Sequence, residues 1–202
     1  MRYESLIKVS ESGLDMNLSF NLKQLQLALV IFFIGLPAAL ADFAVERGTS
    51  NVVDRLITTS ARLNLTISGE PEVALSKGIG LMLEVQTELH RSSLASIYFE
   101  VAAWKDRYLI EYQGLSNRFT LTHLGTGSTQ HFATLSETLS SFTQYRSKLP
   151  LPEGVSTEDE LQIHLRVILD RGQLPGPLRL IALIFPEWRL DSSWGRWPVN
   201  VP

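Results

Sequence analysis

The chain has 202 residues, of which 45% are hydrophobic and 19% are charged, so it is long and apolar enough to bury a core. Its formal charge of −3 argues against a nucleic-acid partner, because such surfaces need a clustered excess of lysine and arginine. The absence of cysteine excludes disulfides, thiolate catalysis and cysteine-based zinc sites.

The stretch LQLALVIFFIGLPAALADF predicts a secretory signal peptide over residues 1–41. Residues 25–36 are apolar almost throughout, Pro37 follows them, and Ala39-Leu40-Ala41 has the small residues of a cleavage site. We therefore expect cleavage after Ala41 and export of the mature chain to the periplasm.

The beginning of this segment is unusual for a signal peptide. Residues 1–24 carry equal numbers of acidic and basic side chains, whereas a start at Met16 leaves Lys23 as the only charge before the apolar core. We expect Met16 to be the true start. The alternative is an uncleaved segment that anchors the chain in the inner membrane, although polar side chains interrupt the apolar stretch of residues 18–40.

The mature chain is expected to have a flexible segment over residues 42–59 and a single β-rich domain over residues 60–202. Apolar and polar side chains alternate in six segments, which indicates strands with one wet face each and therefore antiparallel pairing. These segments are residues 63–67, 81–89, 97–103, 108–112, 119–121 and 161–169. We expect a mainly β (α+β) fold, an antiparallel sheet or sandwich of about six to seven strands with two short helices.

The two helices are expected in GEPEVALSKG (residues 69–78) and TLSETLSSFTQYRSKLP (residues 134–150). The first has a proline in its opening turn and a glycine at its end. The second opens on a capping box of Thr134 and Glu137. Between the strands, QGLSNR (residues 113–118) predicts a hairpin turn.

His123 and His131 flank the stretch LGTGSTQ and are the histidines nearest to a possible site. That stretch contains no third metal ligand, and the GxSxG, HExxH and complete phosphate-loop motifs are absent from the sequence. We expect no catalytic residue, no metal and no cofactor. The alternative is a small envelope enzyme in which His123 or His131 acts with a carboxylate that folding brings near.

The end of the chain, LPGPLRLIALIFPEWRLDSSWGRW, combines an apolar turn over Leu178–Phe185 with three of the four tryptophans. The tail is expected to turn back over the sheet, where the tryptophans would cover the core, because indole rings bury a large apolar area. The functional alternative is an exposed aromatic platform that binds a partner. Its candidate residues are Trp188, Arg189, Trp194, Arg196 and Trp197.

The segments LPGPLRL, WRLDSSW and the closing RW, with PEVALSKGIGL, RYLIEYQGLSNRFTL and FATLSETL upstream, carry a resemblance to a known family. Over residues 60–197 the chain resembles the exported proteobacterial family catalogued as domain of unknown function 4390. The resemblance implies a periplasmic setting without an assigned activity. It also implies a signalling partner, a membrane sensor histidine kinase.

We expect a non-catalytic periplasmic module that binds an envelope protein or such a sensor kinase, with no nucleic-acid partner. A membrane contact is expected only through an uncleaved signal segment. The alternatives are the small envelope enzyme described above and a carrier of an apolar ligand, which would need a cavity of several hundred Å³ between sheet and helices.

Overall fold

The computed structural model describes residues 42–92 and 97–201. The predicted signal segment, its cleavage site after Ala41 and the expected start at Met16 lie outside these residues. Within the two described ranges, no helix is long and apolar enough to cross a membrane.

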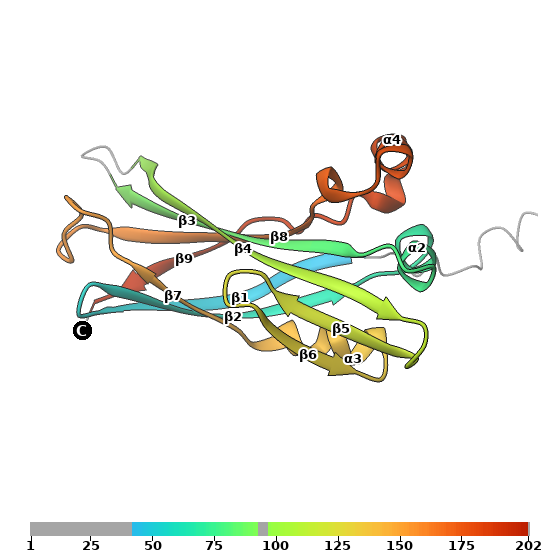
Figure 1. The fold of residues 1–202 in the computed structure, drawn as a ribbon. Coiled ribbons are helices and arrows are strands. Elements are labelled where there is room, and N and C mark those ends of the chain that lie inside the picture. Colours follow the sequence, from blue (N-terminus) through green and yellow to red (C-terminus); the bar gives the residue numbers. More distant parts are fainter. Residues whose placement is uncertain (1–41, 93–96, 202) are drawn as a thin grey trace, which may run out of the picture. The chain divides into compact units, whose positions relative to one another are not determined.

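The described residues form one curled sheet of nine strands (Figure 1), in the order β6-β5-β4-β3-β8-β9-β1-β2-β7. All pairings are antiparallel except the short parallel contact between β1 and β9. The prediction of a mainly β fold is confirmed, but six to seven antiparallel strands is an undercount. The strands are β1 (Asp42–Val53), β2 (Leu56–Thr66), β3 (Leu81–Ser92), β4 (Tyr98–Gln113), β5 (Arg118–His123), β6 (Ser128–Phe132), β7 (Tyr145–Pro150), β8 (Leu161–Leu169) and β9 (Gly195–Asn200).

The expectation of a flexible segment over residues 42–59 is wrong, because β1 and the start of β2 occupy it. Two local features explain why the alternation of apolar and polar residues does not predict this hairpin. A register shift between Val45 and Arg47 interrupts the alternation of β1. The turn places Asp54 and Arg55 at positive φ (50° and 57°), a conformation usually marked by glycine or asparagine.

In the part of the chain that the structure describes, three α-helices and three short 3₁₀ helices connect the strands. The predicted helix in GEPEVALSKG is confirmed as α2. In the second predicted helix, the Glu137 amide donates to Thr134 Oγ1 at 3.1 Å, as the capping box requires. The helix ends at Ser140, however, because the chain continues into η1 and then pairs with β2 as β7. The helices are α2 (Glu70–Ser76), α3 (Leu135–Ser140), η1 (Ser141–Gln144), η2 (Arg171–Gln173), α4 (Gly176–Ile184) and η3 (Pro186–Trp188).

The sheet curls so that its two outer parts approach each other, and α3 packs between them, against β2 on one side and β5 and β6 on the other. The concave face carries the core. On β3 and β8 every second side chain points into it, which is the pattern that the sequence shows. The buried residues of these two strands include Leu81, Leu83, Val85, Leu89, Leu161, Ile163, Leu165, Val167 and Leu169.

Candidate functional site

Two of the three tail tryptophans are buried in the core. Trp188 is fully buried, and Trp197 lies on β9, an interior strand between β8 and β1. The Trp197 indole N–H donates to Ser50 Oγ at 2.8 Å. A Cβ added at Gly48 would lie 2.4 Å from the Trp197 ring, so the glycine makes room for it. The end of the tail is therefore a strand of the sheet itself, whereas Trp188 enters the core from η3, outside the sheet.

The other predicted partner-binding residues do not form one platform. Arg189 follows η3 and is exposed, whereas Trp194 and Arg196 lie beside β8. Trp194 is half-buried under the Arg166 guanidinium, whose carbon lies 4.5 Å from the ring centroid. Burial of Trp188 and Trp197 leaves no continuous aromatic surface among the five candidates.

The most exposed apolar surface of the tail is one that the sequence pattern does not predict. Residues 178–185, expected as a turn, belong mainly to the helix α4, which begins after Pro175 with a proline in its first turn. Ala182 is the buried residue of this helix. The large apolar side chains on the exposed side of this helix, and the one directly after it, are 44–74% exposed. We call these residues the α4 surface: Leu180, Ile181, Leu183, Ile184 and Phe185.

Two arginines hold α4 in place while leaving this surface outward. Arg171 donates to the Ala182 carbonyl at 3.2 Å, and Arg179 donates to the Leu174 carbonyl at 3.1 Å. The helix packs mainly on η2 and η3, and Figure 1 shows it at the end of the sheet that also carries α2. Because complete burial of a large apolar side chain contributes about 1.5–3 kcal/mol, covering these half- to three-quarter-exposed side chains would contribute roughly 1–2 kcal/mol each.

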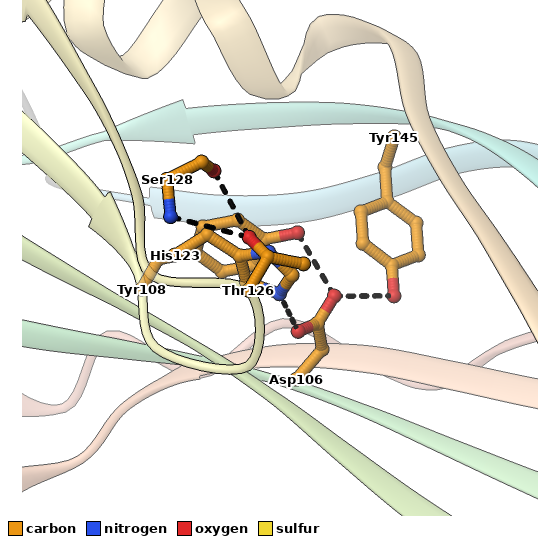
Figure 2. Close-up of polar contacts among 6 residues, drawn as sticks. All are labelled: Asp106, Tyr108, His123, Thr126, Ser128 and Tyr145. Atoms are coloured by element: carbon orange, nitrogen blue, oxygen red, sulfur yellow. Dashed lines mark hydrogen bonds and ion pairs between the residues drawn. The ribbon is translucent and has the colours of Figure 1, made fainter.

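A second feature, the inner-face cluster, centres on the Asp106 carboxylate (Figure 2). Tyr108 and Tyr145 donate hydroxyl hydrogen bonds to Asp106 Oδ2 at 2.9 and 3.3 Å, and His123 Nε2 contacts Oδ1. The Tyr108 and His123 rings are stacked with centroids 4.7 Å apart. Burial, reinforced by the nearby Asp106 charge, raises the pKa of both tyrosines above the ordinary tyrosine value.

The remaining nitrogen of His123 continues this cluster toward the hairpin tip. Its Nδ1 lies 2.7 Å from Thr126 Oγ1, and the Thr126 hydroxyl donates to Ser128 Oγ at 3.0 Å. Carboxylate, imidazole and hydroxyl thus follow one another as they do in hydrolytic triads. Thr126 also accepts the Ser128 amide at 3.3 Å, which is a turn-stabilising contact.

His123 and His131 do not meet. His131 pairs with Thr120 and His123 with Ser128, so the two histidines lie on opposite faces of the β5–β6 hairpin. His131 is exposed. The enzymatic alternative therefore retains His123 with Asp106 and loses His131.

The convex face of the sheet carries a row of polar side chains across β4, β3 and β8. Glu84 accepts hydrogen bonds or ion pairs from Gln86 at 2.6 Å, Lys105 at 3.0 Å and Arg107 at 3.0 Å. Burial alone would raise the pKa of Glu84, but these donors outweigh it and bring the pKa below its ordinary value. Arg166 continues the row by donating to Gln86 at 2.7 Å.

This row ends in the outer-face cluster, which consists of Glu88, His90 and His164. One ligand atom of each residue lies within 4.8 Å of the others. His90 Nε2 is 2.9 Å from Glu88 Oε2, and the two imidazoles are stacked with centroids 3.8 Å apart. Burial, the largest cause, acts together with the charges of His90 and Arg196 to lower the pKa of His164 to about 4.

No prediction from the sequence includes this outer-face cluster. Glu88 and His90 show the spacing of two residues on one face of a strand, which is a visible signal. His164 joins them only because β8 pairs with β3 in the register Glu88–His164. A register shift between Leu89 and His90 in the pairing with β4 adds a local irregularity that no sequence pattern predicts.

An open groove of about 330 Å³ lies along β1, β2 and the start of β7. Its lining includes Arg47, Arg62 and Arg146 together with threonine, serine and tyrosine side chains. An open groove with three arginines is not the enclosed cavity between sheet and helices that the predicted carrier of an apolar ligand would need.

The fold and these surfaces define a mainly β domain whose curled sheet carries one exposed apolar helix and two histidine–carboxylate clusters. Residues 41–198 match the family described as Domain of unknown function (DUF4390), and the chain belongs to this family. Comparison with curated proteins and with solved structures finds no match.

Proposed function

We propose that the chain is an exported, non-catalytic module that binds a protein partner through the α4 surface. The observation that carries this proposal is the outward position of five large apolar side chains on a short helix fixed by two arginines. A monomer gains nothing from this arrangement, whereas a partner that covers the helix gains apolar burial without first having to order it.

A protein groove suits the α4 surface better than a lipid bilayer does. Leu180, Leu183 and Ile184 have the i, i+3, i+4 spacing of helices that bind in apolar grooves. Helices that lie on anionic membranes carry several basic residues on their polar face. Here Glu187 and Arg189 follow the helix with opposite charges, as at the polar rim of a protein interface.

The partner is expected in the cell envelope. Residues 1–41 supply the export signal, which is either cleaved after Ala41 or retained as an inner-membrane anchor. An envelope protein is the partner class, and a membrane sensor histidine kinase is the first candidate because the family resemblance implies it. Among the predicted partner-binding residues, Arg189 borders the α4 surface, and the apolar side chains of α4 take the role first given to the tryptophans.

Site-specific photo-crosslinking in intact source cells tests the surface directly. A photoreactive phenylalanine analogue replaces Ile184, and the matched control carries it at Leu115, which is fully exposed in the β4–β5 turn. We expect one discrete protein adduct at Ile184 and none at Leu115. The adduct counts as the partner only if the purified protein then binds the chain in solution.

The binding step has its own variant pair. Ile184→Asp and Leu115→Asp both place a charge at an exposed apolar position, so neither should change the melting temperature appreciably. We expect Ile184→Asp to weaken binding of the crosslinked protein at least about 10-fold, since it puts a charge in an apolar interface, with no effect of Leu115→Asp. If Ile184→Asp instead abolishes binding to phosphatidylethanolamine–phosphatidylglycerol vesicles and leaves the protein complex intact, the surface is a membrane contact and the proposal fails.

Export is tested by the intact mass of the protein recovered from cell fractions. A soluble periplasmic chain that begins at Asp42 supports cleavage after Ala41. A longer chain in the membrane fraction supports the anchor, and a longer chain in the cytoplasm contradicts export in either form.

The enzymatic alternative has one observation in its favour, the series Asp106, His123 and Thr126. The hydroxyl of Thr126 donates a hydrogen bond within the hairpin turn, and Asp106 on β4 contacts side chains of β5 and β7. Both facts fit a structural role, which the stability of an Asp106 variant tests.

A further inference from the structure

We propose that Glu88, His90 and His164 form a binding site for a divalent transition-metal ion of the zinc or copper class on the convex face of the sheet. This site is separate from the α4 surface and does not depend on the proposed function. Two imidazole nitrogens and one carboxylate oxygen are ligands that such ions accept, whereas magnesium and calcium prefer oxygen ligands.

The backbone brings the three residues together before any ion binds. Glu88 and His164 are directly opposite each other in the β3–β8 pairing, and His90 follows Glu88 on the same face. Their ligand atoms lie within 4.8 Å of one another, and the Glu88 Oε2 to His90 Nε2 distance is 2.9 Å. Ions of this class bind at about 2.0–2.2 Å from each ligand, so side-chain movements of about 1 Å would close the set on one ion.

An unsatisfied buried atom gives independent support. His90 Nδ1 is buried and has no hydrogen-bond partner among the residues that the structure describes. A buried polar nitrogen without a partner costs about 1–3 kcal/mol, and structures rarely keep one without a reason. The ring nitrogen that faces Glu88 is Nε2, so an ion removes this cost where it binds Nδ1 itself, directly or after the imidazole has turned over about its χ2 bond.

The surroundings limit both the access to the ion and its affinity. The His90 and Glu88 side chains are 14% and 24% exposed, so an ion can enter from solvent. Three protein ligands leave at least one coordination position for water or an added ligand. Arg196 is paired opposite His164 on β9, and its charge weakens the binding of any cation there.

The test is calorimetric titration of the tag-free full chain in mild detergent with zinc chloride, and separately with copper(II) and magnesium chlorides. We expect one zinc or copper ion per chain and no measurable heat from magnesium. His164→Ala and Glu88→Gln should each weaken zinc binding at least about 10-fold, because even residues that only support metal ligands have effects of this size. His131→Ala is the matched control, because it removes an exposed histidine on β6, and it should leave the affinity unchanged.

A second readout reports the ligands themselves. Copper(II) bound to the wild-type chain should show electron paramagnetic resonance coupling to two imidazole nitrogens, and His90→Gln should reduce this to one. Circular dichroism confirms the fold of each variant, and Glu88→Gln retains a test if a histidine variant does not fold. Equal affinity in wild type, His164→Ala and Glu88→Gln would overturn the proposal, as would a loss of affinity in His131→Ala of the same size.

Discussion

The two histidine–carboxylate clusters of this sheet contain the same kinds of side chain but differ in how completely their hydrogen bonds are satisfied. In the inner-face cluster, Asp106 receives hydrogen bonds from two tyrosines and contacts His123, and both nitrogens of His123 have partners. In the outer-face cluster, Glu88 faces one nitrogen of His90, and the other nitrogen has no partner within residues 42–92 and 97–201. The first cluster is saturated and the second is not.

The difference follows from the place of each cluster in the fold. Asp106 lies on β4 on the concave side, where its partners come from β5 and β7, which are far apart in the strand order. It therefore links the two parts of the curled sheet that approach each other. The outer-face cluster lies on the adjacent strands β3 and β8, which backbone hydrogen bonds already hold together. Its side chains are therefore not needed to join the strands, and they contact each other and Gln162, whose Oε1 lies 2.6 Å from His164 Nε2.

The largest effect that separates the two clusters is expected from Asp106→Ala. The substitution leaves the hydroxyls of the partly buried Tyr108 and the buried Tyr145, together with His123, without their acceptor, and hydrogen bonds to a charged group contribute about 1.5–3 kcal/mol each. We expect a loss of about 3 kcal/mol in the free energy of unfolding, measured by urea denaturation. Glu88→Gln, the control in the outer-face cluster, should cost less than about 1 kcal/mol. An unchanged stability in Asp106→Ala would show that the cluster is not structural and would revive the enzymatic alternative.

The acidic limb of the stability curve is expected to report on His164. Its folded-state pKa of about 4 lies below the ordinary value of 6.5, so His164 is harder to protonate in the folded chain than in the unfolded chain. The contribution to stability is therefore complete above pH 6.5 and is lost as the pH falls toward 4. His90, Glu88 and Arg196 are the charged or titratable groups that shift this pKa.

The measurement is the urea midpoint of the wild type and of His164→Gln from pH 7 to pH 4. The wild type should lose stability more steeply than the variant over this range. Parallel curves would mean that His164 keeps its ordinary pKa in the folded chain.

A smaller effect is expected from Tyr145→Phe. Its hydroxyl donates to Asp106 over 3.3 Å, a long hydrogen bond, while its ring stays buried in the variant. We expect a loss of about 1 kcal/mol by urea denaturation, and less than this in the Asp106→Ala background because the acceptor is already absent. Equal losses in the two backgrounds would show that the hydroxyl contributes through something other than Asp106.

The parts of this fold that a sequence predicts are those set by neighbouring residues. Alternation identifies β3 and β8, and the spacing of Thr134 and Glu137 identifies the start of α3. The turn at Asp54 and Arg55 has no such local mark, because these residues adopt positive φ only under the constraint of the hairpin. The alternation of apolar and polar residues therefore predicts a strand only after this turn.

The clusters could not be predicted for a different reason, since each depends on the pairing of distant segments. His123 is visible as a candidate, but its carboxylate comes from the strand before it, and Tyr145 arrives only when the sheet curls. The α4 surface was not predicted because the glycine and proline at the start of α4 suggest a turn. A proline in the first turn of a helix, however, loses no hydrogen bond.

The smallest change in stability is expected from His90→Phe, which tests the outer-face cluster directly. Replacing His90 by Phe keeps a ring beside His164 and removes the buried nitrogen that has no partner. Because the lost contact with Glu88 is partly solvent-exposed, we expect the free energy of unfolding in metal-free buffer at pH 7 to change by less than about 1 kcal/mol, or to rise slightly. The same variant should lose the increase in melting temperature that zinc gives the wild type, since a ligand that binds only the folded state stabilises it. A His90→Phe chain that is strongly destabilised without metal would show that His90 holds the sheet together, and the two clusters would then share one structural role.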